Sequence, residues 1–344
     1  MTVPPSAEVV VVGAGINGLA TAHALMKRGR EVLVLEQFPL GHTRGSSHGT
    51  SRIFRLAYPE PHWVRLAQEA LEGWRELERE GGQQLLELHG LIELVPDLGE
   101  SSAAALDACG VAWELLERDT AEREFALVVP EGAVALLQHD AGFVRADRAL
   151  RALARGAHVL PQTKVLSLDP LETTAGAIEA EAVVVTAGAW ARELLAPATE
   201  LDVVVTRETV AYFQLETEKP IPSVVELTPG THAHAMYTLP APGIGLKAGR
   251  HKSGPPTDPN EEGEPDPRLV EEAIAVVAGR FPRADPVPVK TETCLYTLAE
   301  DDQFLLERHG RIVVGSACSG HAFKFAPAVG RRLADLTEEA LAEA

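Results

Sequence analysis

The sequence predicts an α/β fold with α+β elements, in which one parallel-sheet domain is assembled from three separated segments and a second domain holds a mixed, largely antiparallel sheet. Three observations lead to this prediction. A strand, a glycine turn, a helix and another strand follow one another within residues 8–35. Buried apolar strand signals recur at residues 182–187 and 311–315. The intervening segments alternate short strand-like runs with polar turns.

The first segment has the signals of a βαβ unit. Residues 8–13 form a continuous β-branched run, which is typical of a strand at the centre of a parallel sheet. We expect a helix over residues 16–28, ended by Gly29, and a second strand over residues 31–35. Residues 39–55 have no periodicity and predict a polar loop rich in Gly and Ser.

The rest of the chain predicts a further alternation of helices and strands. The expected elements are a helix over 62–80 with one apolar face, short strands and turns over 85–140, a helix over 144–154, strands at 158–161, 182–187, 209–215 and 245–249, a loop over 253–267, a helix over 268–280, a strand at 311–315 and a helix over 326–341. We therefore predict a first domain from residues 1–84, 141–200 and 290–344, and a second from residues 85–140 and 201–289.

Composition argues against several classes of partner. The net charge is −19, with 50 acidic against 31 basic residues, and such a field repels nucleic-acid backbones and anionic membranes. No apolar run approaches the roughly 20 residues that span a bilayer, and the N-terminus lacks a secretory pattern, so we expect a cytoplasmic protein. The three cysteines have no metal-ligand spacing, and we expect no metal site.

A glycine motif follows the first strand and opens the first helix. Gly13, Gly15 and Gly18 allow a tight turn, close approach of a pyrophosphate and close packing of helix on strand. The helix N-terminus offers free N–H groups to phosphates, and Glu36 ends the second strand where an acid accepts hydrogen bonds from ribose. The motif predicts a dinucleotide site, with an ordinary glycine turn as the alternative, and it does not choose between NAD and FAD.

The polar loop that follows carries a more specific pattern. Residues 45–55 read Gly-Ser-Ser-His-Gly-Thr-Ser-Arg-Ile-Phe-Arg, and the chain here resembles the sarcosine oxidase and N-methyltryptophan oxidase branch of the FAD-dependent amino-acid oxidases. The resemblance continues, in order, at residues 186–190, 245–249, 294–297 and 319–325. It implies a discontinuous Rossmann-like FAD-binding domain beneath a substrate domain.

The resemblance also implies roles for single residues. It places Cys294 at a thioether to the flavin, Lys247 near flavin N5 in oxygen activation, and Arg55 and Lys324 at the substrate carboxylate. The expected catalytic residues are Lys247, Arg52 and His48; the substrate residues are Arg55, Lys324, Tyr237 and His251; and the cofactor-binding residues are Gly13, Gly15, Gly18, Glu36, Ser46, Ser51, Arg52, Cys294, Gly320, His321 and Lys324.

Ordinary structural roles remain as alternatives for these side chains. His48 would then be a loop histidine, Arg52 and Arg55 surface charges, Cys294 a small buried apolar residue and Lys247 a strand-edge lysine.

The expected activity is FAD-dependent oxidation of the C–N bond of a small amine or amino acid, giving an imine and, with dioxygen, hydrogen peroxide, by a monomer. A flavin-dependent amine dehydrogenase or imine reductase using another acceptor stays open. Two other classes also remain. An NAD-dependent dehydrogenase gives no role to Cys294 or to residues 319–325, and a non-catalytic flavin-binding protein predicts a flavin that no amine reduces.

Overall fold

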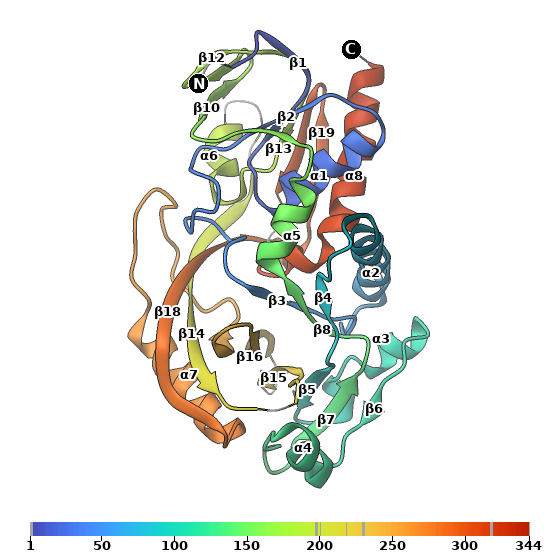
Figure 1. Cartoon of the computed structure of the whole chain (residues 1–344), viewed down its shortest axis with the longest axis vertical. Helices are drawn as coiled ribbons and strands as arrows, with labels where there is room; N and C mark the ends of the chain where they lie inside the picture. Colours follow the sequence, from blue (N-terminus) through green and yellow to red (C-terminus); the bar gives the residue numbers. More distant parts are fainter. Residues whose placement is uncertain are drawn as a thin grey trace.

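Two large sheets occupy opposite ends of an elongated molecule (Figure 1). The structure is a computed structural model, which describes residues 3–196, 199, 201–217, 219–228, 231–316 and 319–343. Among these residues, no helix has the length and apolar character needed to cross a membrane.

The six-stranded sheet is assembled from distant segments, as the sequence predicts. Its order is β19–β20–β13–β1–β2–β9, and every neighbouring pair is parallel except β19 and β20. The strands are β1 (Ser6–Val12), β2 (Val32–Leu35), β9 (His158–Leu160), β13 (Glu179–Val185), β19 (Leu305–His309) and β20 (Ile312–Ser316).

Alternate side chains of this sheet enter two different cores. Val9 and Val11 face a core shared with helices α1 (Ile16–Lys27), α2 (Pro61–Gly81) and α8 (Ala326–Ala342), whereas Val10 and Val12 face the opposite layer. That layer consists of α6 (Ala191–Leu195) and a small sheet of β10 (Val165–Leu168), β11 (Leu171–Thr173) and β12 (Gly176–Ala177). Burial on both faces explains why these strands are continuously apolar.

The eight-stranded sheet is antiparallel except where β5 runs parallel to β15. In spatial order its strands are β18 (Ala284–Ala299), β14 (Val203–Leu215), β17 (Gly245–Arg250), β16 (Thr231–Ala241), β15 (Ser223–Thr228), β5 (Leu91–Val95), β7 (Val134–Gln138) and β6 (Glu114–Leu115). One face packs on α7 (Pro267–Arg280) through residues such as Phe213 and Leu246. The other, which we call the inner face, faces the first sheet.

Two differences from the sequence prediction share one cause, pairing between distant segments. The expected loop over 39–55 contains β3 (Ser51–Phe54), which pairs with β8 (Gly142–Arg145). Strand β8 also pairs with β4 (Leu86–Glu87). Because β8 extends to Arg145, the helix expected from residue 144 begins later, and α5 covers Ala146–Leu153.

Strand β18 crosses the expected domain boundary at residue 290. Residues 85–140 also contain two helices that the sequence analysis did not predict. The two helices are α3 (Ala103–Ala108) and α4 (Arg118–Phe125). Single-turn 3₁₀ helices lie at η1 (Leu98–Glu100), η2 (Gly188–Trp190), η3 (Glu300–Asp302) and η4 (Ala322–Phe325). The domain boundaries themselves stay a prediction.

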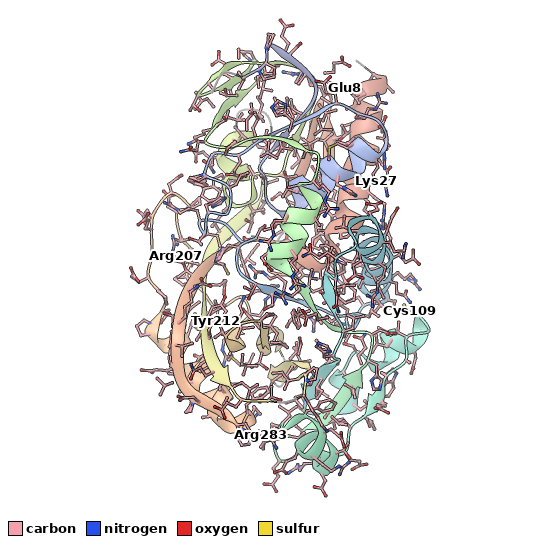
Figure 2. The ribbon with its side chains drawn as sticks, viewed as in Figure 1. Glu8, Lys27, Cys109, Arg207, Tyr212 and Arg283 are labelled. Atoms are coloured by element: carbon pink, nitrogen blue, oxygen red, sulfur yellow. The ribbon has the colours of Figure 1, made fainter. Side chains whose placement is uncertain are left out.

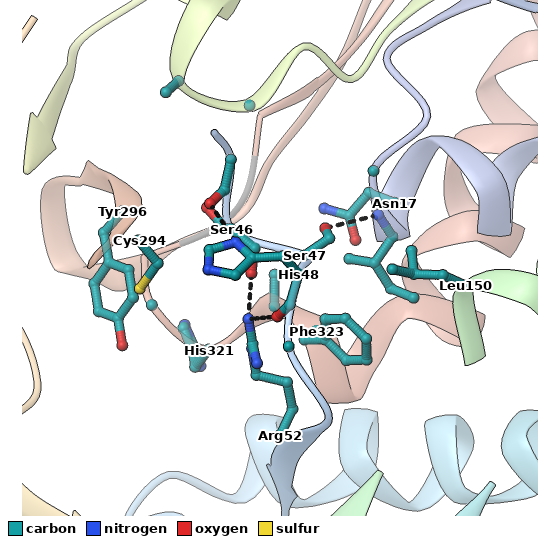
Figure 3. Close-up of a pocket in the computed structure, with 18 of the residues that line it drawn as sticks. Asn17, Ser46, Ser47, His48, Arg52, Leu150, Cys294, Tyr296, His321 and Phe323 are labelled. Carbon is teal, nitrogen blue, oxygen red and sulfur yellow. Dashed lines mark hydrogen bonds between the residues drawn. The ribbon is translucent and has the colours of Figure 1, made fainter. Parts of the chain in front are cut away.

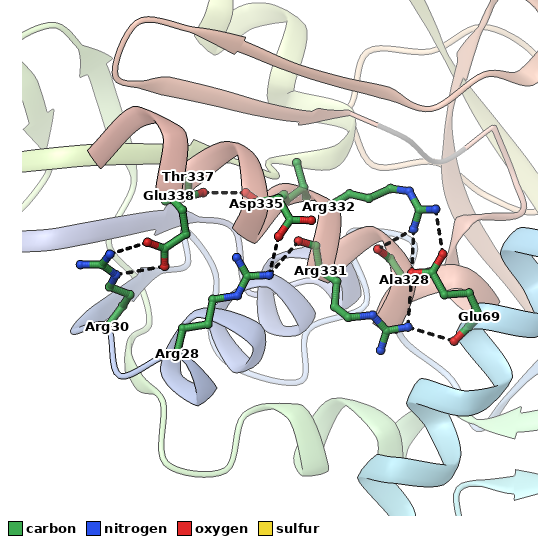
Figure 4. Close-up of polar contacts among 10 residues, drawn as sticks. Arg28, Arg30, Glu69, Ala328, Arg331, Arg332, Asp335, Thr337 and Glu338 are labelled. Carbon is green, nitrogen blue, oxygen red and sulfur yellow. Dashed lines mark hydrogen bonds and ion pairs between the residues drawn. The ribbon is translucent and has the colours of Figure 1, made fainter. Parts of the chain in front are cut away.

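Helices α1 and α8 pack closely because both carry small residues at the contact. A Cβ built on Gly330 would lie 2.6 Å from the backbone of Ala20, so only glycine fits there without movement. Ion pairs on the solvent side join α8 to residues 28 and 30, which follow α1, and to α2 (Figure 4). They include Arg28–Asp335 at 2.7 Å, Arg30–Glu338 and Arg332–Glu69 at 2.7 Å. This packing fixes the direction of α1, whose first turn faces the site described below.

Gly330→Ala is expected to lower the free energy of unfolding by about 1–3 kcal/mol, because the new methyl group overpacks the α1–α8 contact. The control is Gly279→Ala in α7, where the added methyl meets open space and raises stability by about 0.5–1 kcal/mol. Urea unfolding measures both. Equal stability of Gly330→Ala and the wild type would contradict the packing argument.

Candidate active site

A cavity of about 1380 Å³ lies between the two sheets. It extends from the glycine turn after β1, past residues 45–52, to the inner face of the eight-stranded sheet. Because pockets for a single drug-sized ligand occupy roughly 300–1000 Å³, this cavity has room for a dinucleotide together with a small substrate. Figure 3 shows the loop at residues 46–52 with Cys294, Tyr296 and His321 on one side and Asn17 and Leu150 on the other.

The glycine turn leaves no room for side chains. Gly13 has a φ of 103°, and a Cβ there would lie 2.6 Å from the carbonyl oxygen of Thr186. A Cβ on Gly18 would lie 2.0 Å from the carbonyl oxygen of Gly13. The Ser47 hydroxyl accepts a hydrogen bond of 3.0 Å from the Ile16 N–H in the first turn of α1. The predicted motif is therefore a tight turn that opens onto the cavity.

Glu36 holds this turn from the end of β2. Its carboxylate accepts hydrogen bonds of 2.9 Å from the backbone N–H groups of Ala14 and Phe38. The side chain is buried and lines the cavity, so the structure brings Glu36 beside the turn at Gly13 and Gly15, as the motif predicts.

Arg52 organises the loop beside it. Its guanidinium donates to the carbonyl oxygens of Ser46 and His48, both at 2.6 Å, and to that of Ser51 at 2.8 Å. It also lies 5.5 Å from the ring centroid of Phe323. The alternative role of Arg52 as a surface charge is therefore wrong.

Two other loop residues predicted for the site also line the cavity. Ser46 Oγ donates to the carbonyl oxygen of Leu295, which ties the loop to β18. His48 Nδ1 contacts the carbonyl oxygen of Gly45 at 3.1 Å. Burial, followed by the nearby charge of Arg52, lowers the pKa of His48 to about 4, so this histidine is neutral at pH 7.

Lys247 is a buried cation on the inner face. It is 6% exposed on β17, between Tyr212 on β14 and Leu239 on β16, and its Nζ lies 5.8 Å from the Tyr212 ring centroid. Figure 2 labels Tyr212 on the inner of the two long curved strands. Burial, and then repulsion by Arg52, lowers the pKa of Lys247 to about 7. The strand-edge alternative is wrong because β17 is a central strand.

Strand β18 adds a carboxylate and a thiol to the same face. The Tyr212 hydroxyl donates to Glu292 Oε2 at 2.7 Å, and Lys290 forms an ion pair with the same carboxylate. Burial opposes ionisation of Glu292, but the hydrogen bonds from Lys290 and Tyr212 lower its pKa overall. Cys294, two residues farther along the strand, also lines the cavity.

Arg55 and Lys324 meet around the ring of Tyr58. The Arg55 guanidinium lies 4.5 Å and Lys324 Nζ 5.6 Å from the ring centroid. Lys324 Nζ donates to the Tyr58 hydroxyl and to the His321 carbonyl oxygen, both at 2.9 Å. Burial raises the pKa of Tyr58 to about 12, although Arg55 opposes the shift. The structure therefore brings two distant cations together, as expected, around a tyrosine that was not expected.

His321 is buried behind this pair. Its Nδ1 contacts the Tyr58 hydroxyl at 3.3 Å, and its Nε2 contacts the Asp302 carbonyl oxygen at 3.2 Å. Burial and the charge of Lys324 move the pKa of His321 well below its ordinary value. A neutral imidazole that bridges two fixed groups is suited to positioning Tyr58.

Tyr237, His251 and Gly320 gather at the β18 side of the cavity. His251 lies 5.5 Å from the ring of Tyr296, and a Cβ on Gly320, whose φ is 74°, would lie 2.3 Å from that ring and 2.5 Å from the His251 ring. Burial, then the nearby Cys294, raises the pKa of Tyr237. All the residues predicted for catalysis and substrate binding thus line one cavity.

The described residues contain no group of three or more His, Cys, Asp or Glu side chains arranged to hold a metal ion.

Several site residues were missed by the sequence analysis. Ser47 and Tyr58 lie within or next to the polar motif and were open to prediction. Glu93 interrupts an apolar run at residues 91–95, and a lone acid in such a run is a signal. Tyr212 and Glu292 carry no local signal, because only the pairing of β14 with β18 brings them together.

Comparison with known proteins gives consistent matches over nearly the whole chain. The family described as FAD dependent oxidoreductase (DAO) matches residues 8–336. The chain is 34% identical to peroxisomal sarcosine oxidase of Homo sapiens, over 96% of this chain and 92% of the relative. It is 32% identical to monomeric sarcosine oxidase of Bacillus sp. (strain B-0618), over 96% and 91%. The solved structure of NikD, an unusual amino acid oxidase essential for nikkomycin biosynthesis, aligns with a TM-score of 0.86 at 30% identity, over 98% and 95%.

Proposed function

The chain belongs to the family of FAD-dependent oxidoreductases, and we propose that it oxidises the C–N bond of a small secondary amine or amino acid to an imine, with dioxygen as the electron acceptor and hydrogen peroxide as the product. The predicted family and fold class are confirmed, and the chain is a flavin-dependent amine oxidoreductase. The observation that carries the proposal is the meeting of Arg55 and Lys324 around Tyr58, in the cavity that also contains the glycine turn and Lys247.

The residues of the cavity fit FAD. The glycine turn and the N–H groups at the start of α1 suit its pyrophosphate, and Glu36 suits its ribose. Ser51 Oγ is buried at the cavity without a hydrogen-bond partner among the described residues, as expected of a group that serves a ligand. Bound FAD supplies the hydride acceptor and the electrons that reduce dioxygen.

The polypeptide fixes the substrate by charge. Arg55 offers a planar fork that matches a carboxylate, and Lys324 adds a point charge held by Tyr58 and the His321 carbonyl. Relatives named as sarcosine oxidases act on an N-methyl amino acid, which has both a carboxylate and a secondary amine. Positioning of this kind supplies a large part of catalysis in reactions whose chemistry belongs to a cofactor.

Rival functions differ in what they require of this site. An NAD-dependent dehydrogenase does not fit the family. A non-catalytic flavin-binding protein has no need of two cations around Tyr58. A flavin-dependent dehydrogenase or imine reductase would bind its substrate with the same residues but would use an electron acceptor other than dioxygen. The Lys247 experiment below distinguishes these enzymes from an oxidase.

We propose that FAD is attached through Cys294, which lines the cavity near Tyr296 (Figure 3). Acid precipitation should leave a yellow pellet, and the peptide containing Cys294 should gain the mass of the flavin. Cys294→Ala should release the flavin into the supernatant. Cys109→Ala is the control, because Cys109 lies outside the cavity against the Pro61 carbonyl oxygen, and its flavin should stay attached. Complete release of flavin from the wild type would rule out the covalent bond and leave the FAD assignment intact.

Removing either cation of the proposed carboxylate clamp should weaken carboxylate binding while flavin content stays normal. Loss of one partner of a buried charge pair costs on the order of 2–5 kcal/mol, which is roughly 30- to 5,000-fold in affinity. Arg55→Ala and Lys324→Ala should show this loss, and Arg65→Ala on the exposed face of α2 should not. Titration of a substrate and its uncharged amide measures the effect. If the wild type and the variants bind the substrate and its amide with equal affinity, the substrate binds without a contribution from its carboxylate.

Lys247→Met should slow reoxidation by dioxygen far more than anaerobic reduction by the amine, because a fixed cation stabilises the negative charge that dioxygen gains. With its pKa lowered to about 7, Lys247 is charged below that pH and neutral above it, so wild-type reoxidation should slow as pH rises through this pKa, while the variant should be slow and insensitive to pH over the same range. Stopped-flow absorbance of each half-reaction gives both rates.

Lys290→Met is the control for this comparison, because Lys290 lies 5.5 Å from the same Tyr212 ring but its charge is paired with Glu292. Normal oxygen reactivity in Lys247→Met would move the assignment to another cation, and negligible reactivity in the wild type would favour an acceptor other than dioxygen.

A further inference from the structure

A buried carboxylate, Glu93, lies on the wall of the cavity and has no role in the function described above. It is on β5, is 2% exposed and lines the cavity. The pairing register places it beside Val225 of β15, which is beside Tyr237 of β16, so that all three side chains lie on the inner face. These strands run side by side at the lower end of the molecule (Figure 1).

Glu93 has hydrogen-bond partners but, among the described residues, no ion-pair partner. Its Oε2 accepts from the Ser102 N–H and its Oε1 from the Ser102 hydroxyl, both at 2.9 Å. No Lys, Arg or His among the described residues forms an ion pair with it. Because a carboxylate offers about four acceptor sites, two bonds leave capacity for a ligand. An uncompensated buried charge is costly, and a cation entering the cavity would offset that cost.

Most of the cavity-lining side chains near Glu93 on β15 and β16 are apolar. Val225, Leu227, Ala235 and Leu239 also line the cavity and come from the neighbouring strands β15 and β16. A neutral apolar ligand gains no hydrogen bond from a carboxylate, whereas a protonated nitrogen gains a charge-assisted one.

Gln138 connects the segment that carries the carboxylate clamp to the strand pair that holds Glu93. Gln138 Oε1 accepts from the N–H groups of Leu56 and Ala57, at 3.0 and 3.1 Å, and so holds the segment between Arg55 and Tyr58 against β7. Gln138 pairs with Leu91, and Glu93 is the next residue on the same face of β5. Two residues of a strand span about 7 Å. The residue that holds the clamp segment is therefore paired with β5 one such step along the strand from Glu93.

We propose that Glu93 forms a cation subsite that binds a second, protonated nitrogen of the substrate, which makes the substrate class an amino acid with a cationic side chain or a comparable diamino acid. The inference rests on the proposed function, because it uses Arg55 and Lys324 to place the carboxylate. Glu93 binds the far end of the molecule, and the oxidised C–N bond lies between the two anchors.

A purely structural role for Glu93 would be to hold Ser102, which precedes α3 (Ala103–Ala108). Glu93→Gln separates the two roles. The amide oxygen still accepts from the Ser102 N–H and the amide N–H₂ donates to the hydroxyl, so the local contacts persist while the charge is lost. Ser102→Ala does the opposite, because it removes one contact and keeps the charge.

The test measures binding to the flavin-loaded enzyme by the change in the flavin absorbance spectrum. The probe is 4-aminobutanoate, which has no α-nitrogen. Two ligands of the same size serve as its controls: pentanoate, which has a methyl group in place of the ammonium group, and 4-hydroxybutanoate, which has a hydroxyl group there. The same three kinds of ligand are also tested with a chain one carbon shorter and with chains one or two carbons longer. The wild type should bind the amino acid of the fitting length roughly 10- to 150-fold more tightly than the matched alkyl acid. Glu93→Gln should abolish this preference, and Ser102→Ala should keep it.

Each other outcome overturns the inference in a distinguishable way. Equal binding of amino and alkyl acids by the wild type at every length removes the subsite and leaves the clamp in place. Equal binding of amino and hydroxy acids shows recognition of a neutral donor. A Glu93→Gln variant that weakens all the ligands equally shows a structural role. If neither an amino nor an alkyl carboxylate binds the wild type, the proposed function fails with the subsite. The wild-type series stands even if a variant does not fold.

Discussion

The contacts of the Arg52 guanidinium hold the site together. By donating to the carbonyl oxygens of Ser46, His48 and Ser51, it folds the loop inward and fixes the start of β3. That loop in turn bonds to β18 through Ser46, so the half of the molecule that holds the six-stranded sheet and the large antiparallel sheet are joined at the cavity. The same charge helps to lower the pKa values of His48 and Lys247. A lysine at this position could not reproduce the effect, because one ammonium lacks the planar fork that reaches three carbonyls.

Several basic side chains that are buried or half-buried line the cavity of a protein whose net charge is −19. Arg52, Arg55, Lys247 and Lys324 all line it, and burial strengthens their field by excluding water. An anionic ligand is therefore favoured at the clamp. Glu93 lies on the same wall without a basic partner among the described side chains, which divides the cavity into an anion-binding part and a smaller cation-binding part. This polarity would orient a substrate that carries both charges.

The sequence predicted those parts of the site that are encoded in contiguous motifs. The glycine turn, Arg52 and Arg55 belong to short segments whose chemistry can be read locally, and the family resemblance added Lys247 and Lys324 from distant segments. What it did not predict depends on pairing between remote strands. β3 forms because residues 51–54 meet β8, and the Tyr212–Glu292 contact exists because β14 pairs with β18. Neither event leaves a periodic pattern in the residues concerned.

The lowered pKa of Lys247 connects the two halves of the proposed reaction. Near pH 7 its side chain is charged in only part of the molecules, because burial and the charge of Arg52 disfavour a second cation. An amine that enters with its proton would be repelled less by Lys247 in this partly neutral state. In the proposed reaction, negative charge that develops nearby during reduction of dioxygen would raise the pKa of Lys247, and the side chain would then take up a proton. The hydrogen-bonded Glu292, two residues from Cys294, adds a fixed negative charge that supports this proton uptake. A permanently charged arginine at position 247 would lose this adjustment, which gives a physical reason for lysine there.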